Sequence, residues 1–248
     1  MNCILCDKKR LSDNIYDFKV KSAELADNAR AGQFLHILCG GNSYLRRPVS
    51  ICEIVDSEHI RFIFQVKGEG TTALAKTNVG DTIDVLGPLG NGFSFDDCDN
   101  AIVIGGGIGI FPLLEVTKIL GKKAIVLLGF RSEDNIILED EFSKYTDKIF
   151  LATEDGSCGF KGYITDILKR ILETNKIDKI YSCGPMPMMK AVASVASEKQ
   201  IEAQVSLEER MGCGIGACVT CTCNVNGGRK RVCKDGPVFS ASEVDWNA

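Results

Sequence analysis

Four cysteines in the C-terminal part of the chain have a spacing that suits iron–sulfur chemistry. Four residues separate Cys213 from Cys218, two separate Cys218 from Cys221, and eleven separate Cys221 from Cys233. This C-x4-C-x2-C…C spacing is that of plant-type ferredoxins, in which four thiolates hold a [2Fe–2S] cluster. The sequence therefore predicts that these four cysteines bind a [2Fe–2S] cluster and that the protein transfers electrons.

Glycines at 212, 214 and 216 surround the first of these cysteines. A loop that wraps a cluster brings backbone N–H groups close to the sulfurs, where larger side chains would obstruct them. The glycines therefore favour cluster binding over a set of buried, unligated thiols. Cys223 lies in the same run, and we interpret it as a non-ligand.

Other metal centres fit the cysteines less well. Structural zinc sites usually pair two C-x2-4-C units, and only one half of this run has that form. A zinc-binding redox sensor nevertheless stays open as a non-enzyme alternative. A Rieske centre would need His36 and His59, which lie far away along the chain and are not paired in sequence.

The remaining cysteines are expected to be structural. Cys3 and Cys6 form a C-x2-C pair without a second pair, so a chance spacing in a first strand is the better interpretation. Four more stand in or beside apolar runs and are expected to be small buried side chains: Cys39, Cys52, Cys98 and Cys158.

Composition excludes several classes of protein. The net charge of −4 and the pI of about 5.4 give no indication of a nucleic acid or an anionic membrane as partner. The first charged side chain is already at position 7, and the first ten residues contain no apolar run of signal-peptide length. No segment has the ~18 apolar residues of a membrane span. We therefore expect a soluble cytoplasmic protein, whose thiols stay reduced.

The first part of the chain, residues 1–98, alternates short β-rich runs with turn signals. Examples of these runs are FLHILC (34–39), SICEIV (50–55), IRFIFQV (60–66) and DTIDVLGPLG (81–90). Short strands at this spacing are typical of an antiparallel β-barrel or sandwich.

The pattern changes near Asn100, where continuous apolar strands begin to alternate with helices. The expected strands are 101–106, 124–130, 148–153 and 179–184, and the expected helices lie near 112–120, 163–174 and 186–198. Buried parallel strands have this appearance, so residues 99–205 are expected to form a doubly wound parallel α/β domain. A third, cysteine-rich domain is expected over residues 206–248, which makes the chain a multidomain α+β and α/β protein.

Two regions have residues that could bind phosphate groups. Residues 103–116, VIGGGIGIFPLLEV, follow an expected strand and open a helix, although Ile110 stands where the dinucleotide fingerprint needs glycine. Earlier in the chain, Arg47 and Ser50 flank Pro48 and could clamp a diphosphate. Residues 68–72, GEGTT, could present amides and hydroxyls to an anion, or could form a hairpin turn.

These motifs together resemble one superfamily. R-P-x-S at 47–50, G-x-G-T at 68–71, GPLGNGF at 87–93, GGGIGIFP at 105–112, CGPMPMM at 183–189 and the terminal cysteines occur in the order of the ferredoxin–NADP reductase superfamily with an added iron–sulfur domain. The tail ERMGCGIGACVTCTC…RVCKDGPVFSASEVDW is similar to that of the electron-transfer subunits of NAD-dependent dihydroorotate dehydrogenase B. The resemblance covers nearly the whole chain.

The resemblance implies positions for two further cofactors. FAD would lie on the barrel, held by Arg47, Pro48, Val49, Ser50, Ile63, Phe64, Gln65, Gly70 and Thr71. Gln65 departs from the arginine usual in the family. NAD, as a diffusible co-substrate, would bind at Gly105, Gly106, Gly107 and Gly109, with Glu154, Asp155 and the 183–185 turn near the nicotinamide. Cys183 would lie close to the flavin as the catalytic candidate, or would be a buried thiol at the end of a strand.

The resemblance also implies a role. A partner FMN-containing catalytic subunit would oxidise dihydroorotate in pyrimidine biosynthesis, and electrons would pass through the [2Fe–2S] cluster to FAD and on to NAD⁺. The partners would form a heterotetramer with two copies of each subunit. Alone, the chain would show diaphorase-like oxidation of NADH.

Two questions stay open at the level of the sequence. Another NAD(P)H-linked reductase subunit, such as a ferredoxin- or hydrogenase-linked one, is the leading alternative within the superfamily. The segment after the second expected α/β strand carries Arg131 and Glu133, which favour NADP and NAD respectively.

Overall fold

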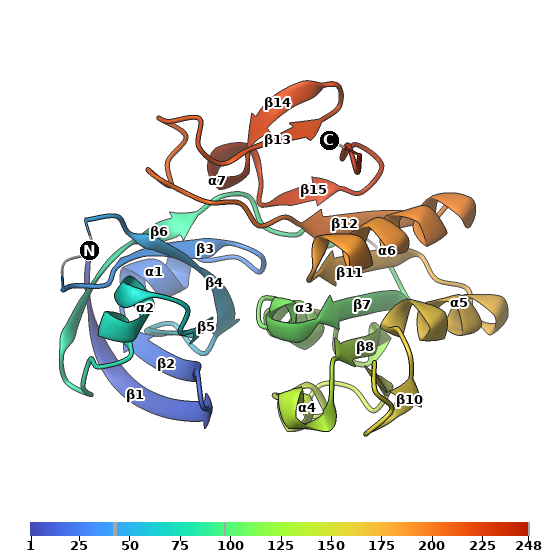
Figure 1. The fold of residues 1–248 in the computed structure, drawn as a ribbon, viewed down its shortest axis with the longest axis horizontal. Helices are drawn as coiled ribbons and strands as arrows, with labels where there is room; N and C mark the ends of the chain where they lie inside the picture. Colours follow the sequence, from blue (N-terminus) through green and yellow to red (C-terminus); the bar gives the residue numbers. More distant parts are fainter. Residues whose placement is uncertain (42–43, 97, 248) are drawn as a thin grey trace. The chain divides into compact units, whose positions relative to one another are not determined.

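The computed structural model describes residues 1–41, 44–96 and 98–247, and its elements are labelled in Figure 1. The chain forms two compact units, each built from several segments. The first unit comprises Met1–Gly92, Glu208–Cys223 and Arg229–Pro237. The second comprises Phe93–Leu207, Asn224–Gly228 and Val238–Ala248.

The first unit contains a closed antiparallel barrel, drawn in blue to teal in Figure 1. Its strands are β1 (Asn2–Ser12), β2 (Ile15–Lys21), β3 (Phe34–Leu38), β4 (Arg47–Ile54), β5 (His59–Gln65) and β6 (Thr82–Leu89). They pair in the order β1-β2-β5-β4-β3-β6, and β1 pairs with β6 to close the barrel. Two short helices, α1 (Ala23–Asn28) and α2 (Glu69–Leu74), connect strands.

Alternation along the strands places one set of side chains in the barrel core. On β3, Leu35 and Ile37 belong to this core and His36 between them does not. An aromatic cluster fills part of the interior, where Phe18 and Phe64 meet edge to face with ring centroids 5.1 Å apart. Closure removes the exposed edges that an open sheet of this length would present.

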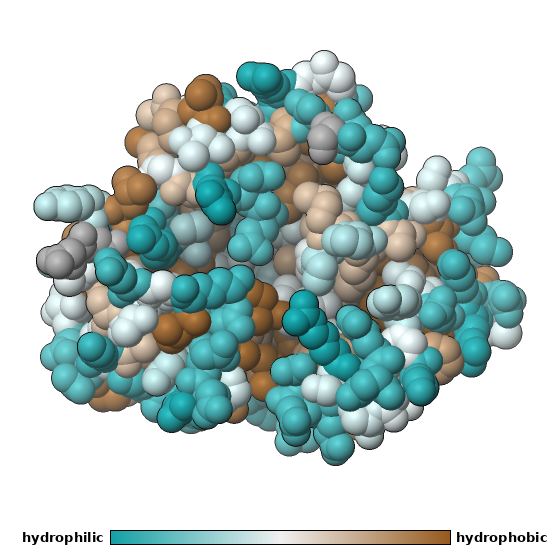
Figure 2. All heavy atoms as spheres, viewed as in Figure 1, coloured by the Kyte–Doolittle hydropathy of each residue, from teal (hydrophilic) through white to brown (hydrophobic). Residues whose placement is uncertain are grey.

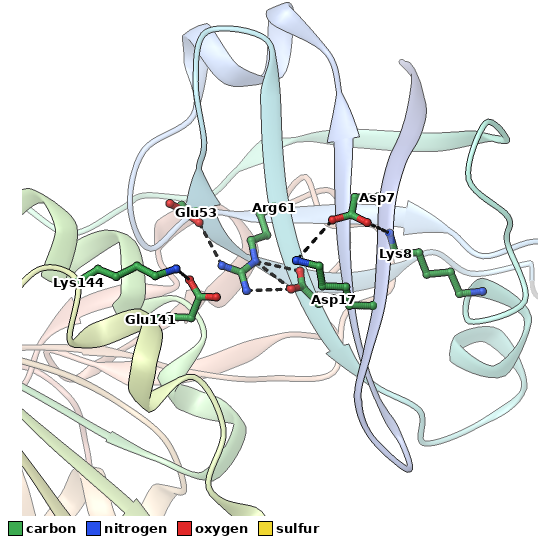
Figure 3. Close-up of polar contacts among 8 residues, drawn as sticks. Asp7, Lys8, Asp17, Glu53, Arg61, Glu141 and Lys144 are labelled. Carbon is green, nitrogen blue, oxygen red and sulfur yellow. Dashed lines mark hydrogen bonds and ion pairs between the residues drawn. The ribbon is translucent and has the colours of Figure 1, made fainter.

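An ion-pair network stiffens one side of the barrel wall. Arg61 lies between Glu53 and Asp17, as Figure 3 shows. Its Nη2 is 2.8 Å from Asp17 Oδ2 and its Nη1 is 3.2 Å from Glu53 Oε2. All three side chains are at most 15% exposed, so removal of the guanidinium would leave two poorly solvated carboxylates side by side.

The second unit is built on a seven-stranded sheet in the order β10-β9-β8-β7-β11-β12-β15. Its strands are β7 (Ala101–Gly106), β8 (Ala124–Phe130), β9 (Ile149–Thr153), β10 (Phe160–Lys161), β11 (Lys179–Cys183), β12 (Glu202–Ser206) and β15 (Val238–Ser240). All neighbours are parallel except β12 and β15. The chain proceeds outward from β7 in one direction and from β11 in the other, so the topological switch point lies between these two strands.

Helices cover both faces of this sheet. The main ones are α3 (Leu113–Leu120), α4 (Glu139–Phe142), α5 (Ile164–Thr174) and α6 (Met186–Glu198). α3 packs with α4, and α5 packs with α6. Because parallel crossovers are right-handed, connections that run in opposite directions from the switch point place their helices on opposite faces. Short 3-10 turns η1 (Gly107–Ile110), η2 (Gly121–Lys123) and η3 (Glu133–Asn135) complete the unit.

The cysteine-rich segment is divided between the two units. β13 (Thr222–Val225) and β14 (Gly228–Arg231) form a small hairpin, and α7 (Val232–Asp235) carries the last of the four cysteines. β15 then pairs antiparallel with β12, with Val205 opposite Phe239. The cysteine-rich segment does not form a compact unit of its own. The expected domain boundaries at residues 98 and 205 stay a prediction.

The expected fold class is confirmed, with its antiparallel barrel, parallel sheet with helices and C-terminal iron–sulfur segment. The expected α/β elements agree closely with those observed. In the first unit, the first strand expected around Cys3 and Cys6 is β1, whereas β2 and α1 were not individually predicted. The glycine stretch at 68–72 begins a short helix, α2, where a hairpin turn was the alternative. None of the helices within the described residues is long and apolar enough to cross a membrane.

Candidate functional site

The four spaced cysteines lie in the first unit and form two pairs. The thiols of Cys213 and Cys218 interact with one another, and those of Cys221 and Cys233 form the second interacting pair. Cys221 and Cys233 are buried, whereas Cys213 and Cys218 are half-buried. Within the described ranges, no three His, Cys, Asp or Glu side chains are arranged to hold one metal ion.

Backbone amides point at two of the sulfurs. The N–H of Cys218 donates to Cys213 Sγ at 3.3 Å, and the N–H of Gly216 donates to Cys233 Sγ at 3.1 Å. The first of these bonds is the main cause that lowers the pKa of Cys213. Hydrogen bonds from Thr220, the side chain first, lower the pKa of Cys218 to about 6. These donors favour the thiolate, which is the form that binds metal, although burial outweighs the Gly216 donor and raises the pKa of Cys233 to about 12.

The loop at Gly214 packs on the barrel at His36. Gly214 has a φ of +72°, which favours glycine, and a Cβ there would collide with Nδ1 of the His36 ring and lie 3.0 Å from its Cε1. His36 lies far from the cysteines along the chain, as noted above, but the fold brings its ring against their loop. His59 is bonded elsewhere, with its Nδ1 2.8 Å from Asp56 Oδ1.

Asn91 of the GPLGNGF motif fixes the arm that carries Cys233. Its side-chain amide donates to the carbonyls of Lys234 at 3.2 Å and Asp235 at 3.0 Å, and its backbone N–H donates to the carbonyl of Gly236 at 2.6 Å. No spacing argument singled out Asn91. The GPLGNGF motif contributed only to the resemblance. The structure shows that Asn91 in this motif binds the backbone directly after the fourth cysteine.

Cys223 differs from the four paired cysteines. It lies on β13, and burial is the largest cause that raises the pKa of its thiol to about 11, followed by the charge of Glu209. No backbone N–H from another described residue donates to its sulfur. We therefore expect Cys223→Ser to retain the visible absorption and iron content of the wild type.

The matched variant Cys221→Ser removes one thiol from the pair with Cys233. It is expected to lose most of the iron, because a two-iron cluster needs two protein ligands on each iron. Iron and acid-labile sulfide analysis of both purified variants checks the assignment. Equal iron loss in the two variants would show that Cys223 also contributes to binding.

The expected flavin residues on β4 and β5 fall on two faces of the barrel wall. Val49 and Phe64 belong to the barrel core, so only their main chains are available to a ligand. Ser50 pairs with Phe34 of β3, and Pro48 pairs with His36, which puts their side chains on the outer face. The Arg47 guanidinium donates to the carbonyls of Leu45 at 2.6 Å and Arg46 at 3.3 Å.

The remaining expected flavin residues are close to these strands in sequence. Ile63 is buried but is not part of the barrel core, and Gln65 is half-buried opposite Ile15 of β2. Gly70 and Thr71 lie in the first turn of α2. The Thr71 hydroxyl accepts the N–H groups of residues 67 and 68, at 2.9 and 3.2 Å, so it already caps this helix.

The glycine loop of the second unit follows β7 at the switch point of the sheet. A Cβ on Gly109 would lie 2.5 Å from Gly184 Cα, so this loop packs directly on the turn after β11. Gly105 and Cys183 are register neighbours at the ends of their strands. The crevice at the carboxyl ends of strands beside a switch point is where doubly wound sheets bind nucleotides.

The other residues expected near the nicotinamide differ in exposure and in hydrogen bonding. Cys183 is half-buried at the end of β11. Asp155 is exposed, and hydrogen bonds from Ser157 lower the pKa of its carboxyl. Glu154 is also exposed, at the end of β9. Of the four other cysteines expected to be buried, Cys39, Cys52 and Cys98 are buried, and Cys158 is half-buried.

Two family descriptions match parts of this chain. The family described as the iron-sulfur cluster binding domain of dihydroorotate dehydrogenase B matches residues 208–245. The family described as the oxidoreductase NAD-binding domain matches residues 103–194. The first match contains all four paired cysteines, and the second contains the glycine loop and the turn after β11.

Curated relatives match over nearly the full length. The electron transfer subunit of dihydroorotate dehydrogenase B (NAD(+)) from Fusobacterium nucleatum subsp. nucleatum is 40% identical, with 98% of each chain covered. The subunit of the same name from Geobacillus sp. (strain WCH70) is 41% identical, with 95% of each chain covered. A solved NADH-dependent reduced ferredoxin-NADP oxidoreductase, described for flavin-based electron bifurcation, superimposes with a TM-score of 0.89 at 33% identity, covering 99% of this chain and 90% of that one.

Proposed function

This chain belongs to the family of electron transfer subunits of dihydroorotate dehydrogenase B, and we propose a specific assignment of its residues to that role. It is an oxidoreductase subunit with an iron–sulfur domain and an NAD-binding domain. One observation supports the assignment most strongly. His36 of β3, the strand paired with the R-P-x-S run of β4, contacts the cysteine loop at Gly214 within one compact unit.

The proposed cluster ligands are the two cysteine pairs. Cys213 and Cys218 would hold one iron and Cys221 and Cys233 the other, because a [2Fe–2S] core presents two irons that each take two thiolates. Support comes from the pairing of the thiols and from the two N–H groups that donate to sulfur. The protein holds the fourth ligand in place through Asn91 and positions the first through the loop at Gly214.

The proposed flavin site is the outer face of β3, β4 and β5. Bound FAD would exchange a hydride with NAD and single electrons with the cluster. The Arg47 guanidinium, satisfied only by carbonyls among the described residues, supplies positive charge for the diphosphate. Ser50 presents a hydroxyl on the outer face of β4, whereas Arg47 begins the strand opposite Ile37, and the main chain of β5 offers polar groups at Gln65.

The proposed NAD site is the crevice after β7 and β11. The loop from Gly105 to Gly109 lets the pyrophosphate approach the backbone, because four of its five residues are glycine. The turn at Gly184 and Pro185 forms the other side, and Cys183 stands at its start. The family assignment favours NAD over NADP.

A catalytic partner subunit follows from the family, since an electron transfer subunit delivers electrons to or from another protein. We propose that this partner is the FMN-containing dihydroorotate dehydrogenase and that two copies of each form a heterotetramer. Figure 2 shows apolar surface among polar atoms at the top of the view, where the cysteine segment lies in Figure 1. Ile215 and Val219 of this segment are 54% and 75% exposed, which suits a docking surface over the cluster.

The location that fits these proposals is the cytoplasm. The twelve cysteines, all within the described residues, are free thiols, which is compatible with a reducing compartment.

The purified chain, loaded with FAD and cluster, is expected to oxidise NADH with a dye acceptor. It is expected to leave dihydroorotate unchanged until the FMN subunit is added, and the two proteins should then copurify. The assay compares dye reduction by NADH with dye reduction by dihydroorotate, each with and without the partner. A chain with full cofactor content that fails to oxidise NADH would contradict the assignment of the NAD site.

A further inference from the structure

The two histidines of the chain lie in opposite environments. His59 is half-buried and bonds to the carboxylate of Asp56. His36 is 1% exposed, and neither Nδ1 nor Nε2 makes a hydrogen bond of good geometry within the part of the chain that the structure describes, although the backbones of Arg46 and Cys213 lie close to the ring. A buried polar group left unpaired costs about 1–3 kcal/mol, so a group from outside the chain is expected to complete the bonding of this ring.

The position of His36 relates the ring to the cysteine loop. On β3 its neighbours Leu35 and Ile37 point into the barrel core, so the imidazole lies on the outer face. There it is covered by the backbone at Gly214, directly after Cys213. Its register partner on β4 is Pro48, in the run proposed to hold the flavin. The ring therefore lies between the cysteine loop and the flavin strand.

The chemistry of the imidazole ring suits a hydrogen-bond donor to sulfur. A neutral imidazole has one N–H and one acceptor nitrogen. It can therefore donate one hydrogen bond without placing a full charge beside the cysteine loop.

We propose that His36 is a positioning residue for the iron–sulfur cluster, supporting the loop at Gly214 and donating its ring N–H to a sulfur of the bound cluster. The proposal rests on the proposed function, in which Cys213 is a ligand. An N–H bond to sulfur stabilises the reduced and more negative form of a cluster, and so raises its reduction potential.

Variants at His36 test this role in the full chain carrying FAD and cluster. His36→Leu removes the N–H, His36→Gln keeps a donor, and His59→Leu is the matched control. In an EPR-monitored redox titration, His36→Leu is expected to shift the oxidised-to-reduced equilibrium about tenfold toward the oxidised cluster, which is about 59 mV for one electron. His36→Gln should recover part of that shift and His59→Leu none of it. A wild-type potential in His36→Leu, or equal shifts in the Leu and Gln variants, would overturn the proposal.

A second measurement needs no change at His36, so it remains informative if the variants lose their cluster. Wild-type protein with ¹⁵N only in histidine is reduced, and the cluster signal is examined by pulsed EPR for hyperfine coupling. We expect a weak ¹⁵N coupling that persists in His59→Leu. A normal cluster signal without this coupling overturns the role of His36 alone. No iron–sulfur signal at all would overturn the proposed function as well.

Discussion

Gly214→Ala is expected to abolish retention of the iron–sulfur cluster while FAD stays bound. Alanine at this position faces two obstacles, since the φ of +72° is unfavourable for a side chain and the new methyl group would collide with the His36 ring. The His36 ring is enclosed between barrel and loop, so the loop must move instead, and Cys213 moves with it. Iron, sulfide and flavin contents of the purified protein measure the effect.

Gly227→Ala is the control that separates the conformational cost of a positive φ from the collision with a neighbouring side chain. Gly227 has nearly the same φ, +71°, but no atom lies within 4 Å of a Cβ built on it. It should therefore bear only the conformational cost of about 1–2 kcal/mol and retain its cluster. Full iron content in Gly214→Ala, or equal iron loss in both variants, would contradict the contact between the loop and His36 as the cause.

Gly109→Ala is expected to reduce NADH oxidation by at least tenfold in kcat/KM, which is about 1.4 kcal/mol of transition-state stabilisation. A Cβ there would lie 2.5 to 2.7 Å from main-chain atoms of Gly184 and Cys183, and a backbone cannot turn aside as a flexible side chain does. The glycine loop and the turn after β11 must then separate, which deforms the nucleotide crevice. Steady-state dye reduction gives the ratio, and absorption spectra check that both cofactors are retained.

Gly107→Ala is the control in the same loop. Its φ is +54°, yet nothing lies within 4 Å of an added Cβ, so it bears conformational strain without the collision. We expect a small stability loss and a smaller effect on kcat/KM than for Gly109→Ala. The reverse ranking would show that the loop is deformed by strain at 107 and not by its packing on Gly184.

Much of the fold could be predicted because local pattern and tertiary structure agree. The continuous apolar runs that became β7 and β8 are buried on both faces, and such runs have few other solutions. The strand β15 could not be found this way. Its three residues gain their structure from pairing with β12, a long-range contact that leaves no periodic signal.

The cysteine spacing could likewise indicate a cluster, because ligand spacing is a local property. The part of the barrel against which the cysteine loop packs could not be predicted in the same way. His36 precedes Gly214 by most of the chain, and their contact arises only when the segment folds back on the barrel. The amide of Asn91 is a similar case, since it bonds to carbonyls of residues 234 and 235. The only local sign of the contact was a histidine, His36, within the apolar run 34–39 that was expected to be a strand.

The central claim is that electrons pass between NADH, FAD and the cluster within this chain. The most direct test is an anaerobic titration of the full, cofactor-loaded protein with NADH, followed by optical bleaching of the flavin and by EPR of the cluster. We predict that a reduced [2Fe–2S] signal grows as the flavin bleaches, without any partner subunit present. Complete flavin reduction with no cluster signal, in protein shown to contain iron and sulfide, would contradict the account.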